Sequence, residues 1–367
     1  MEGGYLDAMK RALELRPPNA LAKLGDDSKV LLLNGKDVYR VLRDECVIIM
    51  ACNARIPHVI PGIMRAAEDL DAAICFEIAK TESDMDGGYT GMDPVEYWET
   101  VVRHAEEVGL TRPLIIHRDH TTVKTTSTDA VESARRILNL SLRQGYTSYS
   151  IDASFNPLSD NIRITADLAR PIDMAGLGLE VEVGEIKSAG QEGSVTTVEE
   201  ALEYIRSLTD LGLHPDLLAI NNGSKHGNYL PGEEVHIDLG RTLEIFNAIR
   251  PFGVCIAQHG ITGTPPHLIG QFADNGIRKG NVATQWQNIC HELFPSELRR
   301  DIAKWVKDTG KDIKNASKHF KSEIAGIPEE SRRAIEERAY REAREMLVHF
   351  RAPGTGTRVI ERMAEGG

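Results

Sequence analysis

Eight short apolar runs, most of them followed by a polar turn and a longer amphipathic segment, constrain the fold of this chain more than any other feature. Their β-branched and apolar residues show no sustained alternation, which is typical of strands buried on both faces of a parallel sheet. The runs are 47–54, 72–79, 113–120, 148–154, 179–186, 217–223, 253–260 and 277–284.

The segments between these runs predict helices. Each begins near Pro, Thr or Asp, and the last three end at glycine, which are ordinary helix start and stop signals. The clearest examples are 57–70, 93–109, 129–145 and 197–212. Eight strand–helix alternations predict a closed (β/α)8 TIM barrel, with an open, doubly wound sheet as the alternative.

The barrel does not account for the whole chain of 367 residues. We predict a helical N-terminal extension over 1–44, the barrel over 45–289, extra C-terminal helices over 290–352 and a flexible, glycine-rich tail over 353–367. The charged C-terminal helices are expected to present a solvated face or to pack on the barrel or a partner subunit.

Composition excludes several classes of protein. A formal net charge of −12 argues against a nucleic-acid-binding protein, which would need Lys and Arg for phosphate contacts. No apolar run approaches the roughly 20 residues of a membrane span, and we find no secretory signal. The five cysteines are odd in number and form no C-x-x-C pair, which favours reduced thiols and a cytoplasmic location.

Histidines follow three of the predicted strands: His120 the third, His226 the sixth and His259 the seventh. A lone histidine at a strand end is more often structural than a metal ligand. Because the carboxyl ends of barrel strands meet at one mouth, three such histidines are expected to converge there. They predict a zinc site with an open position for substrate.

Two carboxylates predict a buried positive charge in the same region. Glu180 and Glu182 stand two apart in one strand, so their side chains face the same side. Burying both without a partner would be costly, so a cation, a metal or a basic residue is implied. The alternative to a metal is an internal ion pair with a lysine or arginine.

A phosphate pocket is expected beside the histidines. Gly227 and Gly260 follow strands six and seven, and small residues there allow backbone N–H groups to approach an anion. Thr262 lies in the second of these loops, and Asn281 and Thr284 belong to the eighth run.

At this point an ordered set of motifs resembles the class II, zinc-dependent fructose-bisphosphate aldolases and their tagatose-bisphosphate relatives. The resemblance extends from the first strand to the helices after the eighth, and the NVAT element is more similar to the tagatose-type branch. The motifs are HRDH (117–120), IDASFNPLSDNI (151–162), LEVEVGEI (179–186), GSKHGNY (223–229), HGITG (259–263) and KGNVATQ (279–285).

The resemblance implies a role for each matching residue. It makes His120, His226 and His259 the zinc ligands, Asp119 the acid/base at the aldehyde carbonyl, and Glu182 an inner-site carboxylate near the metal. Asn53 would touch substrate, and the dihydroxyacetone phosphate group would be bound by Gly227, Gly260, Thr262, Asn281 and Thr284. A monovalent cation, Na⁺ or K⁺, would lie around Lys225, Gly227 and Gly260.

The implied reaction is the reversible cleavage of fructose 1,6-bisphosphate to dihydroxyacetone phosphate and glyceraldehyde 3-phosphate, a step of glycolysis and gluconeogenesis. Zinc would act as a Lewis acid, and Asp119 would handle the proton of the C4 hydroxyl. A second base would come from the loop after strand five, with Glu192 as the candidate and Glu185 behind it. The family also implies a homodimer or homotetramer with a phosphorylated sugar as its substrate.

Departures from the family pattern concern the loop base and the distal phosphate. The loop reads KSAGQEGS (187–194), without the usual glycine pair and acidic residues. Ala79 stands where the family has a serine, and Ser317 where it has an arginine; nearby lysines could compensate, namely Lys314, Lys318 and Lys321. The alternative substrates are therefore tagatose bisphosphate or another ketose 1-phosphate with an altered aldehyde half.

Three rival functions remain. A Schiff-base aldolase would need a lysine on strand six, but Lys225 lies in the loop beyond it. A metal-dependent barrel hydrolase usually begins with a His-x-His pair on strand one, which here reads IIMACNAR. A non-catalytic barrel would have no use for Asp119 and three histidines.

Overall fold

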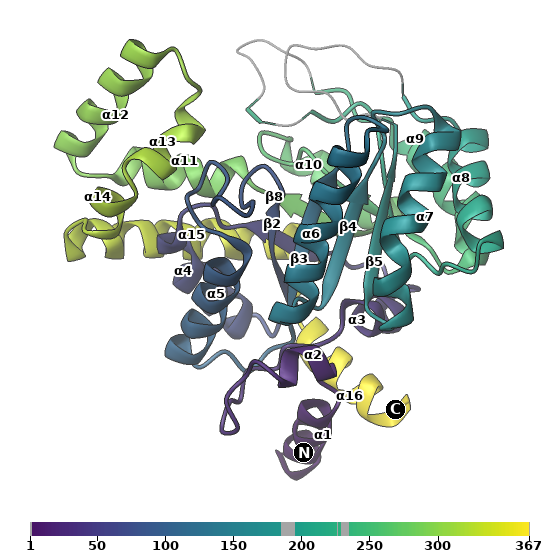
Figure 1. Ribbon diagram of the computed structural model, residues 1–367. Coiled ribbons are helices and arrows are strands. Elements are labelled where there is room, and N and C mark those ends of the chain that lie inside the picture. Colours follow the sequence, from purple (N-terminus) through teal and green to yellow (C-terminus); the bar gives the residue numbers. More distant parts are fainter. Residues whose placement is uncertain (1, 185–194, 226, 229–234, 367) are drawn as a thin grey trace.

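The computed structural model describes residues 2–184, 195–225, 227–228 and 235–366. Eight parallel strands pair in sequence order and close into a barrel, which confirms the predicted fold (Figure 1). The strands are β1 Ile49–Asn53, β2 Ile74–Ala79, β3 Leu114–Thr122, β4 Ser148–Asp152, β5 Gly178–Val183, β6 Leu217–Ile220, β7 Cys255–Gln258 and β8 Ile277–Val282.

Helices surround the barrel and cover the outer faces of its strands (Figure 1). Apolar residues on both faces of each strand are thereby buried, as the continuous apolar runs require. The α-helices are α4 Ile60–Asp69, α5 Pro94–Val108, α6 Thr128–Gln144, α7 Leu158–Met174, α8 Val198–Asp210, α9 Leu239–Ile249, α10 Pro266–Ile269 and α11 Thr284–Leu293. Short 3-10 turns are η1 Pro57–Val59, η2 Arg250–Phe252 and η3 Phe272–Asn275.

The helix ends follow the signals in the sequence. The Asp93 carboxylate accepts hydrogen bonds from the backbone N–H groups of Val95 and Glu96 at the start of α5, and Gly109 ends that helix with a left-handed φ of 72°. A side-chain N-cap also begins α6, where Ser127 accepts from Ala130 N. Such caps satisfy N–H groups that have no partner within the helix.

Further helices precede and follow the barrel. Before it come α1 Glu2–Glu14, α2 Pro18–Leu21 and α3 Gly35–Leu42. After it come α12 Ser296–Thr309, η4 Ile313–Asn315, α13 Ala316–His319, α14 Lys321–Ala325, α15 Glu329–His349 and α16 Thr355–Gly366.

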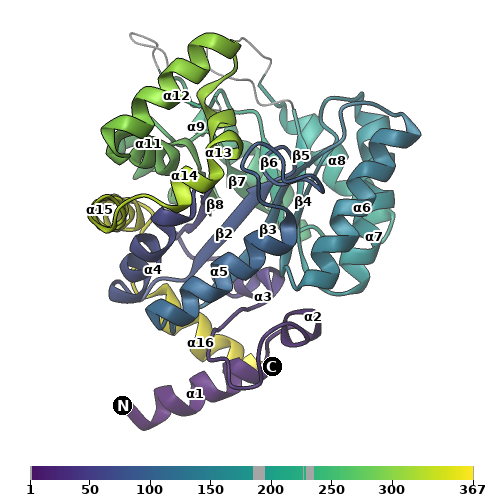
Figure 2. The same cartoon turned by 60° about the vertical axis from the view of Figure 1, so that its left-hand side comes forward.

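The C-terminal segment differs from the prediction of a flexible tail. It forms helix α16, which lies beside α1 (Figure 2). Val359 and Ile360 are fully buried, and the Thr355 hydroxyl accepts a hydrogen bond from Ala73 N, directly before β2. The glycines suggested a loose chain, but the apolar face between them packs under the barrel end at which the strands begin.

Helix α15 packs against α4 on the side of the barrel. A Cβ at Gly62 in α4 would lie 2.1 Å from the Glu336 carbonyl oxygen, so only glycine permits this close approach. Buried Ile335, Ala339 and Ala343 form the contact face of α15, while many of its charged residues are exposed. No helix in the described part of the chain is long and apolar enough to cross a membrane.

Candidate active site

A cavity opens at the barrel mouth, and most of the predicted site residues line it. They are Asn53, Asp119, His120, Gly227, His259, Gly260, Thr262, Asn281 and Thr284, joined by Arg55, Ala79, Glu82, Ile261 and Ala283. The predicted ligand His226 and the candidate bases Glu185 and Glu192 lie outside the described residues.

An irregularity in β3 places two consecutive side chains at this mouth. In a regular strand, neighbours point to opposite faces, so Asp119 and His120 could not both face the site. The register with β4 shifts between Arg118 and Thr121, and His120 adopts a left-handed φ of 35°. This bulge turns both side chains into the cavity, at a conformation that is uncommon for a residue with a Cβ.

The rings of His120 and His259 meet edge to face across the mouth, with centroids 4.3 Å apart. His120 Nε2 and His259 Nδ1 are separated by 2.5 Å. Each ring's other nitrogen faces a buried carboxylate: His120 Nδ1 lies 2.8 Å from Glu182, and His259 Nε2 lies 2.9 Å from Glu180. Two imidazoles fixed from behind by carboxylates, with their other nitrogens converging, form the usual arrangement of metal-ligating histidines.

The two glutamates of β5 differ in their partners. Glu182 accepts from the Ser150 hydroxyl at 2.9 Å and faces His120. Glu180 forms an ion pair with Lys279 at 2.8 Å, so the internal lysine pair that the sequence left open does occur, in addition to the contact with His259. Both carboxylates lie on the lumen side, as their spacing of two residues predicts.

The carboxylate of Asp119 is held by amides from two other strands. Asn281 Nδ2 donates to Oδ1, and Asn53 Nδ2 donates to Oδ2, both at 3.2 Å. Burial would raise the pKa of Asp119, but the positive charges of His120 and Lys279 outweigh it and hold that pKa below its usual range. The group is therefore ionised and oriented, as an acceptor of protons must be.

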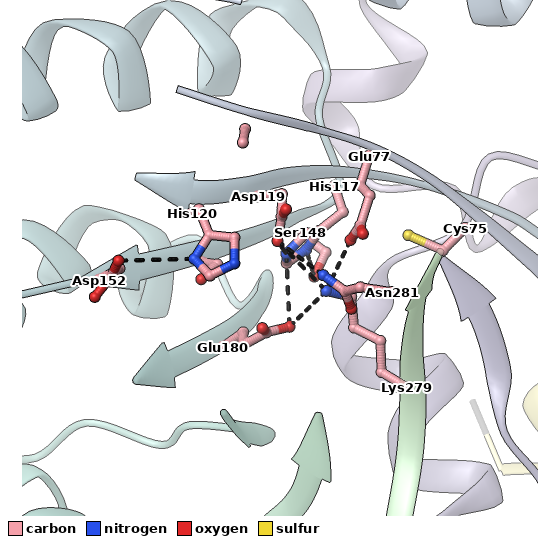
Figure 3. Close-up of polar contacts among 12 residues, drawn as sticks. Cys75, Glu77, His117, Asp119, His120, Ser148, Asp152, Glu180, Lys279 and Asn281 are labelled. Atoms are coloured by element: carbon pink, nitrogen blue, oxygen red, sulfur yellow. Dashed lines mark hydrogen bonds and ion pairs between the residues drawn. The ribbon is translucent and has the colours of Figure 1, made fainter. Parts of the chain in front are cut away.

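Several functional candidates were not singled out from the sequence, and the most buried lie below the mouth in the lumen (Figure 3). Lys279 of β8 is fully buried and forms a second ion pair with Glu77 of β2 at 2.8 Å. His117 Nδ1 lies 2.8 Å from the Ser148 hydroxyl. Polar residues two positions before a predicted site residue, such as His117 before Asp119 and Lys279 before Asn281, are the signal that could have found them.

Arg55 and Glu82 were also missed, because each follows its strand in a loop where charged residues are common. Glu82 is 2% exposed and accepts hydrogen bonds from Arg55 Nε at 2.6 Å, Asn53 Nδ2 at 3.0 Å and the Tyr89 hydroxyl at 3.1 Å. Arg55 also donates to Gln287 at 2.9 Å. These contacts fix Asn53, which in turn holds Asp119.

The residues that depart from the family pattern lie in different places. Ala79 lines the mouth cavity, where it pairs in register with Asp119. Ser317 instead lines a neighbouring cavity, which shares Arg55 with the first. The three lysines make other contacts: Lys314 faces Asp312, Lys318 bonds the Asp86 carbonyl, and Lys321 pairs with Glu96.

The opposite side of the cavity can receive an anion. Gly227 and Gly260 have φ values of 92° and 68°, and a Cβ at Gly260 would lie 2.4 Å from the Lys225 carbonyl oxygen. The Thr262 hydroxyl accepts from Gln285 N, which ties the loop after β7 to the first turn of α11. The N-terminus of this helix, beginning at Thr284, therefore points its positive end toward the cavity.

The closed barrel and this mouth define a (β/α)8-barrel enzyme with a candidate metal centre formed by histidines and carboxylates. Comparison with known protein families identifies the family of this barrel enzyme. The model of the class-II fructose-bisphosphate aldolases matches residues 34–332, and the chain belongs to this family. The protein is thus a carbon–carbon lyase of a metal-dependent family.

Individual relatives are distant in sequence. The chain is 25% identical over 271 residues to a fructose-bisphosphate aldolase of Streptococcus pneumoniae, which covers 73% of this chain and 83% of the relative. It is 29% identical over 229 residues to one of Streptococcus pyogenes, covering 62% and 70%.

Solved structures show the same fold. The YdjI aldolase of Escherichia coli K12 superposes with a TM-score of 0.62 at 17% identity, covering 89% of this chain and 99% of its own. The fructose-bisphosphate aldolase of Campylobacter jejuni gives 0.64 at 15% identity, covering 88% and 97%.

Proposed function

We propose that this protein is a zinc-dependent aldolase that reversibly cleaves fructose 1,6-bisphosphate into dihydroxyacetone phosphate and glyceraldehyde 3-phosphate. One observation carries this proposal: two imidazole nitrogens converge beside an ionised, doubly hydrogen-bonded Asp119. The names of the relatives from both streptococci support this substrate.

The donor set fits zinc. Imidazole nitrogen suits this ion, and the carboxylates of Glu180 and Glu182 fix which nitrogen of each ring is directed at the metal. His120 and His259 would hold the ion, with His226 as the third ligand and Glu182 beside it. When bound, zinc supplies a Lewis acid that polarises the substrate carbonyl and stabilises negative charge at the adjacent carbon.

The proton of the C4 hydroxyl is the task of Asp119. In cleavage its carboxylate takes this proton as the C3–C4 bond breaks, and in condensation it returns the proton to the aldehyde oxygen. Asn53 and Asn281 hold the two carboxylate oxygens, so the group keeps one orientation in both directions. The second base, which exchanges the proton on the dihydroxyacetone carbon, is assigned to Glu192, with Glu185 as the alternative.

The phosphate of dihydroxyacetone phosphate would occupy the anion-binding side of the cavity. Backbone N–H groups near Gly227 and Gly260, the Thr262 and Thr284 hydroxyls and the Asn281 amide are its proposed partners. A monovalent cation, Na⁺ or K⁺, would lie next to this phosphate around Lys225.

The test is aldol cleavage of fructose 1,6-bisphosphate with and without EDTA, followed by addition of zinc. Activity that is lost to the chelator and restored by zinc is the expected result. Cleavage indifferent to EDTA, or trapping of a covalent adduct by borohydride, would overturn the proposal in favour of a lysine-based aldolase. Hydrolysis of an ester or amide without any aldol cleavage would favour a barrel hydrolase.

A second candidate keeps the chemistry and changes the aldehyde half. Ala79 offers no hydroxyl to a distal phosphate, and the only cationic side chain among the described residues lining the mouth cavity that is not an imidazole is Arg55, which is engaged by Glu82 and Gln287. These observations favour a ketose 1-phosphate whose far end is not phosphorylated. The comparison of kcat/KM for fructose 1,6-bisphosphate, tagatose 1,6-bisphosphate and fructose 1-phosphate decides, and a large preference for either bisphosphate eliminates this candidate.

A further inference from the structure

We propose that Lys279 is a positioning residue of the reaction: its buried ammonium fixes Glu180 and Asp119 across the barrel lumen, and so aligns the metal ligand His259 with the acid/base carboxylate. This inference rests on the proposed roles of His259 and Asp119. It concerns a lysine that does not line the mouth cavity and has no direct access to substrate.

The position of Lys279 is central to the lumen (Figure 3). Its Nζ lies 2.8 Å from Glu180 Oε2 of β5, 2.8 Å from Glu77 Oε2 of β2 and 3.7 Å from Asp119 Oδ1 of β3. The lysine itself belongs to β8, so one ammonium joins four strands. All four side chains are at most 2% exposed, and water therefore screens these charges little.

Through Glu180 the lysine acts on the metal ligand. Lys279 holds one carboxylate oxygen of Glu180, and the other oxygen accepts a hydrogen bond from His259 Nε2 at 2.9 Å. The proton on Nε2 leaves Nδ1 of His259 as the nitrogen that faces His120. A carboxylate that orients a ligating histidine in this way is worth about 10- to 100-fold in metal affinity.

The same lysine also acts on the acid/base. Asp119 Oδ1 is held between Lys279 at 3.7 Å and Asn281 Nδ2 at 3.2 Å. Lys279 and Asn281 are two residues apart in β8, so a single strand directs both toward one carboxylate oxygen. Loss of the ammonium would leave three buried carboxylates, Glu77, Glu180 and Asp119, without this counter-charge.

The lysine occupies a place that another cation could take. Carboxylate and imidazole atoms of Glu77, His117 and Asp119 lie close enough together to ligate a metal ion. Because the ammonium of Lys279 contacts Glu77 and approaches Asp119, it supplies the positive charge that a metal ion would otherwise bring to this cluster. The lumen thus keeps its own fixed cation beneath the position assigned to zinc.

The experiment replaces Lys279 by methionine, which has a similar length and no charge. Zinc affinity is measured by competition with a chromophoric chelator, the Co²⁺ absorption spectrum reports the ligand geometry, and kcat is measured at saturating zinc. We expect zinc affinity to fall about 10-fold or more and kcat to fall about 100-fold. Lys36→Met is the matched control, because Lys36 pairs with Asp216 and Asp173 away from the mouth cavity, and it should leave zinc affinity and kcat within about threefold of wild type.

A double-mutant cycle separates positioning from general damage. If Lys279 acts on the metal through Glu180, then Lys279→Met should lower zinc affinity much less in a Glu180→Gln background than in wild type. Additive losses overturn this route, as does a folded Lys279→Met protein with wild-type zinc affinity and kcat. Should Lys279→Met fail to fold, Lys279→Arg carries the test, because it keeps the charge and moves it; unchanged zinc affinity and kcat would then refute the proposal.

The readouts distinguish this inference from the proposed function. If wild-type protein cleaves none of the ketose phosphates, the proposed function fails, whereas zinc affinity and the Co²⁺ spectrum still test the role of Lys279. If wild-type protein is active and Lys279→Met retains both properties, only the present inference fails.

Discussion

The two ends of the barrel bury polar groups that serve different purposes. At the mouth, Asp119, His120 and His259 converge on a cavity, and their hydrogen bonds prepare a site for a ligand. At the opposite end, Asp216 before β6 accepts from Leu179 N at 2.9 Å and lies 4.0 Å from Lys36. In barrel enzymes, catalysis belongs to the end at which the strands finish and stability to the end at which they begin. Substitutions at the two ends should therefore have separable effects.

The largest effect on catalysis is expected for Asp119→Asn at the mouth. The amide keeps the shape of the side chain but cannot take the C4 hydroxyl proton, so kcat should fall about 10³-fold, equivalent to about 4 kcal/mol. The new NH2 group replaces one of the two oxygens that accept from Asn53 and Asn281, so the unfolding temperature, followed by circular dichroism with zinc present, should fall, but by less than for a truncation in the apolar core. A variant with near wild-type kcat would remove Asp119 from the mechanism, and a large loss of stability would break the contrast between the two ends.

At the end of the barrel where the strands begin, here called the closed end, Ile360→Ala should lower stability and leave catalysis unchanged. Ile360 is fully buried in α16, and truncating a buried isoleucine costs about 2–5 kcal/mol through lost burial and the cavity left behind. Urea denaturation should show this loss, whereas kcat at 25 °C should be unchanged. A fall in kcat without a loss of stability would mean that α16 communicates with the mouth. Val348→Ala, at an exposed position of α15, serves as the surface control.

Asp216 gives the closed end a pH dependence. Burial raises the pKa of Asp216 to about 6, although Lys36 and the hydrogen bond from Leu179 N act against this. The folded protein therefore binds this proton more tightly than the unfolded chain, so the group costs stability once it ionises. The cost develops as pH rises from about 4 to about 6 and reaches about 3 kcal/mol at most.

The corresponding variant is Asp216→Asn, which keeps an acceptor for Leu179 N and removes the charge. Its free energy of unfolding, minus that of wild type, should rise between pH 4 and pH 7. A difference that is constant or falls over this range would show that Asp216 ionises normally. Metal-dependent effects are avoided if both proteins are compared as apoproteins.

The sequence was sufficient to predict the barrel from local signals, and most of the residues that line its mouth from local signals together with the family resemblance, but not Arg55 or Glu82. Strand runs, helix caps and histidines at strand ends can be found without knowing the contacts. The bulge that turns both Asp119 and His120 inward depends on how β3 pairs with β4, which no local pattern encodes. The pairing of Lys279 with Glu77 and Glu180 likewise needs the closed barrel, since these residues are far apart in the chain.

Other predictions were limited by the same dependence on packing. The glycine-rich composition of the C-terminal end predicts a flexible tail, but its apolar residues pack beneath the barrel and form α16. Four points stay predictions: the oligomeric state, the native metal, the monovalent cation, and the segment boundaries at 44, 289 and 352. The first three depend on partners or ligands rather than on residues near in sequence.

The smallest effect is expected for Ala79→Ser, which sharpens the contrast within the mouth itself. Ala79 lines the cavity at the end of β2, where an added hydroxyl could donate to a distal phosphate. One such hydrogen bond is worth about 0.5–1.5 kcal/mol, so the ratio of kcat/KM for fructose 1,6-bisphosphate to that for fructose 1-phosphate should rise about 2- to 12-fold. Stability and zinc affinity should not change, because the site of substitution borders the cavity and carries no ligand. If the ratio stays constant, the distal end of the substrate does not pass Ala79, and the neighbouring cavity that contains Ser317 becomes the place to look for it.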